Sequence, residues 1–184
     1  MSKSTPSNHP TLVTPRDVAR HYLGDVVYGA NDGIITTFAV AAGVAGANLS
    51  PAVVLILGGA NLLADGFSMG ASNFLSVRSA AAVERLEADS ISEPFALKHG
   101  FATFLAFVVA GSVPLLAFAF PLGGLDPFSV TVVLTLATLF VVGAARTFVT
   151  RGRWWIEGAE MFAVGATAAA VAYGVGALLA GIVP

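Results

Sequence analysis

The sequence has no cysteine and little charge, and each shortage excludes a class of protein. Asp, Glu, Lys and Arg make up 11% of the 184 residues, less than half of the roughly 25% that is usual in soluble domains. Without cysteine there is neither a disulfide-stapled secreted module nor a thiolate metal site. The formal net charge is −2, whereas nucleic-acid binding needs a strongly basic face. The chain is therefore neither an ordinary soluble domain nor a nucleic-acid-binding protein.

Hydrophobic residues are abundant instead, and they lie in long stretches without charge. They account for 56% of the chain, and the mean hydropathy is +0.82. A helix that spans a bilayer needs about 20 mostly apolar residues, and the turn-forming residues of 47–51 divide the first long stretch in two. The sequence therefore predicts an all-α membrane protein whose five transmembrane helices cover residues 25–47, 52–77, 98–120, 128–149 and 158–183.

The basic residues predict the orientation of these helices. All nine Lys and Arg precede the first predicted helix or lie in or near the connections between the second and third and between the fourth and fifth. Because cationic loops stay in the cytoplasm, five spans with a cytoplasmic N-terminus and an outside C-terminus put every one of them on the same side. Residues 1–13 are polar and broken by proline, so we expect a disordered tail, followed from Thr14 to His21 by a short amphipathic lead-in at the membrane surface.

Two aspartates lie where the bilayer should be. Asp32 is about 10 Å into the first predicted helix, at 1.5 Å per residue from Asp25, and Asp65 is near the middle of the second. An aspartate in hydrocarbon costs roughly 2.5 to 3.5 kcal/mol on insertion and usually faces a bundle interior or an ion pathway. We interpret both acids as functional. The alternative is that they only join helices together.

Polar residues recur along one face of each of these two helices. The lines consist of Asp25, Gly29, Asp32 and Thr36 on the first helix and of Asn61, Asp65, Met69 and Asn73 on the second. Carboxylates and amides are hard ligands, and a thioether is accepted by the later divalent metals, so the set favours Fe²⁺ or a neighbour such as Mn²⁺. Because the second helix returns toward the side where the first begins, we expect Asp32 and Met69 at similar depth, where they could share one metal site.

Four more acids lie near the predicted cytoplasmic ends and could line a mouth of the pathway. Glu84 and Glu87 share one face of the segment between the second and third helices, where a solvated linker is the plainer interpretation. Glu157 and Glu160 open the last helix, where the helix dipole favours acids, so capping is the alternative to lining the mouth. His99 begins the third helix, and we expect it at the interface.

Glycine pairs bracket the two aspartates. Gly29 with Gly33, and Gly66 with Gly70, are small residues four apart, a spacing that lets helix backbones approach closely. We therefore expect the first and second helices to form the dense centre of the bundle, against each other or across a dimer axis.

Four segments together resemble the vacuolar iron transporter family: DVVYGANDGIITTFAVAAGVAGA, NLLADGFSMGASNFLSVRS, EPFALKHGFATFLAFVVAGSVPLL and EMFAVGATAAAVAYGVGALL. The resemblance runs from about His21 to the C-terminus and implies a five-helix homodimer that exchanges cytoplasmic Fe²⁺, often Mn²⁺ as well, for protons from the other side. It places the family's pathway aspartate at Asp32, its methionine at Met69 and an acid nearer the mouth at Asp25. Asp65 and Asn61 match no family ligand securely.

One departure from the family is large. Better-known members have a long, glutamate-rich metal-binding domain between the second and third helices, whereas only about 22 residues, Val77 to Lys98, separate them here. That domain is therefore expected to be absent, which makes Glu84 and Glu87 poor candidates for its ligands. The membrane core is retained, so transport is still expected. Because the sequence has no recognisable targeting segment and lacks the cytoplasmic domain, we expect metal export across a bacterial inner membrane.

Two other functions compete with transport. An intramembrane aspartyl protease also uses two aspartates, but the GxGD motif is missing, and neither catalytic residues nor a resident cofactor are predicted. The chain is thus not expected to be an enzyme. The second competitor is a passive structural or partner-binding membrane protein.

Overall fold

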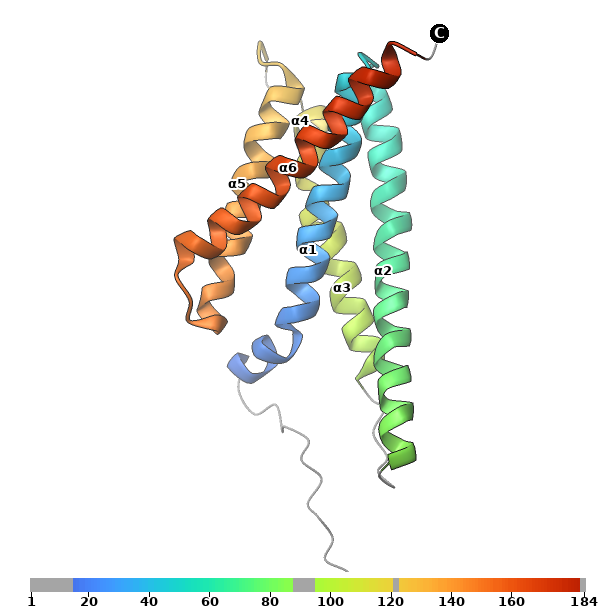
Figure 1. The fold of residues 1–184 in the computed structure, drawn as a ribbon, viewed down its shortest axis with the longest axis vertical. Coiled ribbons are helices and arrows are strands. Elements are labelled where there is room, and N and C mark those ends of the chain that lie inside the picture. Colours follow the sequence, from blue (N-terminus) through green and yellow to red (C-terminus); the bar gives the residue numbers. More distant parts are fainter. Residues whose placement is uncertain (1–14, 88–94, 121–122, 183–184) are drawn as a thin grey trace, which may run out of the picture.

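All regular secondary structure in the described part of the chain is helical. The computed structural model describes residues 15–87, 95–120 and 123–182, and the predicted tail, residues 1–13, lies outside these ranges. The helices are α1 (Pro15–Gly46), α2 (Pro51–Glu87), α3 (Ala96–Gly111), α4 (Val113–Ala119), α5 (Pro127–Thr150) and α6 (Trp154–Ala180). Figure 1 shows an elongated bundle in which α3 and α4 follow one another in a single span. The predicted all-α class is confirmed.

Four of the spans are long and apolar enough to cross a bilayer. They are Pro51–Val83, Ala96–Ala119, Pro127–Phe148 and Trp154–Ala180. The helix α1 has 32 residues, enough for about 48 Å, but it does not meet the same criterion because Asn31, Asp32 and two threonines lower its hydropathy. The protein is thus an integral membrane protein, and its most polar long helix is the one with the candidate pathway acid.

The turn between α1 and α2 lies where the sequence predicts it. Asn48 takes a left-handed conformation with φ of 54°, which asparagine tolerates at a helix end. The N–H of Leu49 then donates to the carbonyl oxygen of Val44 at 3.1 Å, and Pro51 begins α2, a position where its missing N–H is no loss.

Two helices are longer than we expect from the sequence. The lead-in before Asp25 is continuous with α1, which begins at Pro15, and α2 continues ten residues beyond Val77 to Glu87. Neither extension is apolar enough to be recognised as a span by hydropathy, and this is why the sequence places the helix ends earlier. In Figure 1 both extensions lie at the same end of the bundle.

The third span is divided where proline enters it. Ser112 separates α3 from α4, and Pro114 has no N–H to continue the helical bonding pattern. The hydroxyl of the buried Thr131 on α5 donates to the carbonyl oxygen of Pro114 at 3.0 Å. That bond gives the hydroxyl of Thr131 an acceptor inside the protein, because the hydrocarbon of the bilayer offers none.

Close approaches through glycine join α1 and α2 to α3 rather than to each other. A Cβ on Gly29 or Gly33 would meet the carbonyl oxygens of Thr103 and Phe107 on α3, and one on Gly70 would lie 2.8 Å from the carbonyl oxygen of Gly100. Within one chain the two glycine pairs do not bring the first and second helices against each other, because α3 is the partner of both. The centre of the bundle is α1, with Ile34, Phe38 and other side chains fully buried.

Asp126 caps the N-terminus of α5 and lies outside the apolar spans, so it allows a test of helix capping. The main-chain N–H and the hydroxyl of Ser129 both donate to Asp126 at 2.8 Å and lower the pKa of that carboxyl. The ionised carboxylate of Asp126 therefore stabilises the fold fully at pH values above the ordinary pKa of aspartate. This stabilisation is lost as the pH falls through the lowered pKa of Asp126. We expect Asp126→Ala to reduce the unfolding free energy by about 1 kcal/mol at pH 7 and by less at pH 3, measured by denaturant titration in detergent. An equal loss at both pH values would contradict this account.

Candidate functional site

The two predicted polar lines face one another across the antiparallel helices α1 and α2. At one end the amide nitrogen of Asn73 donates to Oδ1 of Asp25 at 2.7 Å. Asp32 lies seven residues after Asp25 on α1, and Asp65 lies eight residues before Asn73 on α2. Because the two helices are antiparallel, this places both predicted acids of the membrane interior at nearly the same level, about two turns from the bond between Asn73 and Asp25.

The carboxylate of Asp32 has no protein partner within the described residues. It is half-buried, and the nearby hydroxyl of Thr36 donates to the main-chain oxygen of Asp32, at 2.9 Å, rather than to the carboxylate. On α2 the amide nitrogen of Asn61, one turn from Asp65, is buried without a hydrogen-bond partner. The carboxylates of Asp32 and Asp65 are thus available to a cation, whereas the unpaired N–H of Asn61 is a donor that fits an acceptor such as water.

Met69 lines a cavity of about 480 Å³ between α1 and α2. The cavity is also lined by Gly24, Asp25, Tyr28, Ser68, Ser72, Asn73 and Ser76. Asp25 is among the residues that line this cavity with Met69, and Asp32 is not. By the register of the antiparallel helices, Met69 lies opposite Gly29, between Asp25 and Asp32, so a site shared by Met69 and Asp32 stays a prediction.

Asp25 is the centre of a polar cluster that includes α3. Its Oδ2 atom lies 2.5 Å from Nδ1 of His99, and the amide nitrogen of Asn73 is 2.6 Å from the hydroxyl of Thr103. Sequence reasoning missed His99 and Thr103 as parts of the site. The available signal was that Asp25 and His99 both stand at the start of predicted spans on the same side.

The two predicted mouth acids whose side chains the structure describes, Glu157 and Glu160, are not part of this cluster. Oε1 of Glu157 accepts from the hydroxyl of Thr150 at 2.7 Å, and its Oε2 lies 3.7 Å from Arg146, so this acid joins α5 to α6. Glu160 is exposed. Glu84 and Glu87 belong to the end of α2, but their side chains lie outside the described residues. Within the described ranges no three His, Asp or Glu side chains are grouped to hold an ion.

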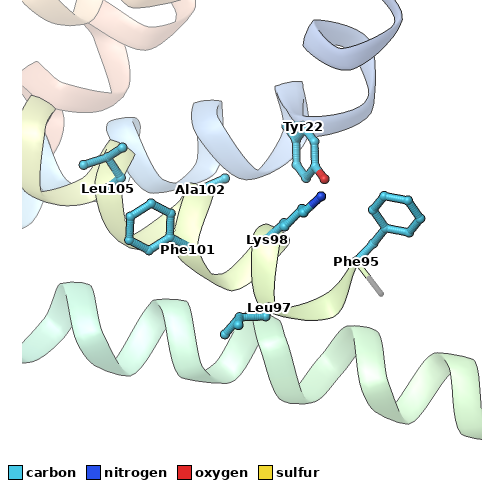
Figure 2. A pocket seen from close by; sticks show the side chains of 7 residues that line it. All are labelled: Tyr22, Phe95, Leu97, Lys98, Phe101, Ala102 and Leu105. Atoms are coloured by element: carbon cyan, nitrogen blue, oxygen red, sulfur yellow. The ribbon is translucent and has the colours of Figure 1, made fainter. Parts of the chain in front are cut away.

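A second hollow is apolar rather than acidic. A groove of about 710 Å³ runs between Tyr22 on α1 and the first half of α3, and apolar side chains make up most of its lining. Figure 2 shows Tyr22 and Lys98 at one end and Phe101 and Leu105 further along. It contains no carboxylate, so the chemistry of a cation site belongs to the α1–α2 cavity.

Comparison with known proteins gives one consistent result. The model of the VIT family matches residues 23–95 and 83–177. A vacuolar iron transporter from Toxoplasma gondii is 31% identical, over 86% of this chain and 74% of that protein. Vacuolar iron transporter 1 from Arabidopsis thaliana is 26% identical over 81% and 82%, and vacuolar iron transporter 2 from Oryza sativa is 28% identical over 82% and 84%.

The alignments also agree with a short connection between α2 and α3. About 158 residues of this chain (86% of 184) are aligned with the Toxoplasma gondii protein over 226 positions, so that relative has additional residues inside the matched region. The two matches to the family model meet at residues 83–95, where the sequence predicts that a domain is missing. With matches over most of its length to both the family model and these relatives, the chain belongs to the VIT family.

Proposed function

We propose that this protein moves divalent metal ions, Fe²⁺ and also Mn²⁺, out of the cytoplasm in exchange for protons, along a pathway lined by α1 and α2. The observation that carries this proposal is that Asp32 and Asp65 stand at nearly the same level of the antiparallel helices α1 and α2, and that Asp32 has no partner among the described residues. Acids retained in a membrane interior without a protein counter-ion fit an ion pathway. Curated relatives named vacuolar iron transporters support the choice of metal.

The proposed topology has α1 as a fifth span. Basic side chains on the described part of the chain support this, because they lie at the end of the bundle where α1 and α3 begin: Arg78, Lys98, Arg146, Arg151 and Arg153. Since such residues remain in the cytoplasm, this end is cytoplasmic and the C-terminus is outside. The membrane is, in this proposal, a bacterial inner membrane.

A homodimer is the proposed assembly. The α1–α2 cavity is open on the outer face of the chain, where Ser68, Ser72 and Ser76 are exposed and Tyr28 is 64% exposed. Hydroxyl groups directed at lipid lack hydrogen-bond partners. A second copy placed against this face would cover them and enclose the pathway.

Exchange follows from competition for the same oxygens. A carboxylate must be ionised to hold a metal ion, and binding a proton removes that ability. When the acids face a proton-rich outside, protonation releases the metal, and the return movement brings the proton inward. The amide of Asn61 and the thioether of Met69 do not titrate, so in this scheme they select the ion while the two acids couple it to protons.

The direct test uses the purified chain in liposomes with an Fe²⁺ indicator and a pH indicator inside. Imposing a proton gradient should drive Fe²⁺ movement, accompanied by proton flux in the opposite direction. If the protein only joins other components in the membrane, no gradient will move Fe²⁺. Titration of the detergent-solubilised protein then separates the two functions, because acids that merely join helices should bind no divalent cation at micromolar levels.

Met69 provides a prediction about selectivity. Met69→Leu keeps the volume of the side chain and removes the sulfur, so we expect Fe²⁺ transport to fall several-fold and Mn²⁺ transport to fall less, because Mn²⁺ prefers oxygen ligands. The measurement is the ratio of the two rates in the same liposomes. Met161→Leu, in the buried core of α6, is the matched control and should leave the ratio unchanged. An unaltered ratio in Met69→Leu would exclude the sulfur as a ligand.

A further inference from the structure

Two histidines from different helices meet at the cytoplasmic end of the proposed pathway. Nε2 of His21 on α1 lies 3.1 Å from Nε2 of His99 on α3. Tyr22 packs against both imidazoles, with its ring centroid 4.8 Å from each. His99 is 14% exposed and its partner Asp25 is 16% exposed. The two imidazoles are therefore held in place by neighbouring side chains, and His99 remains partly accessible to an ion.

The contacts of His99 fix which of its nitrogens has a lone pair to give. An ionised carboxylate can only accept, so Nδ1–H of His99 donates to Oδ2 of Asp25 at 2.5 Å. With its proton on Nδ1, the neutral form of the ring has a lone pair on Nε2, the nitrogen that faces His21. Asn73 holds the other oxygen of Asp25 at 2.7 Å. A carboxylate behind a histidine in this way is the usual arrangement around histidines that bind metal ions.

The separation of the two nitrogens suits one shared ion. Imidazole nitrogens bind transition metals at about 2.0 to 2.1 Å, so two of them on one ion lie about 2.9 Å apart at a right angle and about 3.4 Å apart at the tetrahedral angle. The observed 3.1 Å falls between these limits. Without metal, the same distance is satisfied by a hydrogen bond from one ring to the other, which an arriving ion would replace.

We propose that His21 and His99 form a two-imidazole loading site for a divalent transition-metal ion at the cytoplasmic mouth, ahead of the acids. This deepens the proposed transport function and rests on it for the identity of the cargo. Imidazole accepts ions such as Fe²⁺ and Zn²⁺, whereas Mg²⁺ and Ca²⁺ require oxygen ligands. The site would therefore reject Mg²⁺, which a pathway of carboxylates alone would admit.

Two donors are enough for a site that must release its ion. The remaining positions on the ion would be filled by water, so binding is weak and reversible. Asp25, directly behind His99, also lines the cavity with Met69. An ion that leaves the imidazoles thus meets the next group of ligands immediately, and the polar cluster leads into the α1–α2 pathway.

The test uses Co²⁺ as an air-stable probe and X-ray absorption of the bound ion, which counts imidazole ligands. The full chain is purified without a polyhistidine tag, because its three histidines are the only ones in the sequence. We expect two imidazoles on Co²⁺ in the parent and in the control His9→Gln, and at most one in His21→Gln or His99→Gln. Affinity should fall by about tenfold in the latter two, and excess Mg²⁺ should not displace Co²⁺ from the parent.

The outcomes separate this inference from the transport function. Co²⁺ bound without imidazole in the parent, or an unchanged spectrum in His21→Gln, overturns the loading site even if liposomes transport Fe²⁺. Imidazole-bound Co²⁺ in a protein that moves no Fe²⁺ supports the site and contradicts transport. Because His99 also holds Asp25, His99→Gln could unfold, and a thermal unfolding curve checks this. Among the described residues His21 makes no such second contact with an acid, so His21→Gln decides the question alone.

Discussion

Asp32→Asn is expected to reduce Fe²⁺ transport by about tenfold or more, because even residues that only support a metal ligand contribute that much to affinity. The substitution keeps the size and polarity of the side chain but removes the charge that holds a divalent ion and the group that carries a proton. Asp32 has no hydrogen bond or ion pair to lose within the described residues, so the fold should be retained. Initial rates in liposomes, with and without a proton gradient, measure the effect.

Asp126→Asn is the matched control for this change. It removes one negative charge in the same way, outside the spans, and asparagine caps a helix about as well as aspartate. Its transport rate should equal that of the parent. Equal rates for Asp32→Asn and the parent would remove Asp32 from the pathway, and the facing acids would then be no more than a contact between α1 and α2.

Much of the fold can be predicted from the sequence, because the bilayer constrains it strongly. Stretches without charge locate the four apolar spans, and the residues of 47–51 locate the turn after α1. Four-residue spacing identifies the faces of α1 and α2 that carry the acids, and these faces do meet, as the bond between Asn73 and Asp25 shows. Periodicity succeeds here because it reports directly which side chains share a helix face.

Periodicity does not identify the neighbour that a face will meet. The glycines of α1 and α2 were expected to pack together, yet both sets pack on α3, since a small residue favours close approach to any backbone. For the same reason the sequence does not identify His99 and Thr103 as the residues that complete the cluster around Asp25.

Gly33→Ala is expected to reduce the unfolding free energy by about 1 to 3 kcal/mol, the usual result of overpacking. A Cβ at this position would press on the carbonyl oxygen of Phe107 and lie 3.0 Å from its Cα. Both contacts are with main chain, so no side-chain rotation relieves them, and α1 must move away from α3. Unfolding in detergent by chemical denaturant, followed by circular dichroism, gives the change.

Gly24→Ala, in the same helix, is the control. Nothing lies within 4 Å of a Cβ at that position, so alanine should stabilise the helix by up to about 1 kcal/mol.

The close packing at Gly33 also matters for function, because Gly33 follows Asp32 directly in the sequence. If α1 is held against α3 at Gly33 to set the distance of Asp32 from Asp65, then Gly33→Ala should also slow Fe²⁺ transport, and so should Gly111→Ala, whose Cβ would lie 2.7 Å from the carbonyl oxygen of Gly33. Loss of stability without loss of transport in both variants would show that the close packing of α1 supports the fold alone.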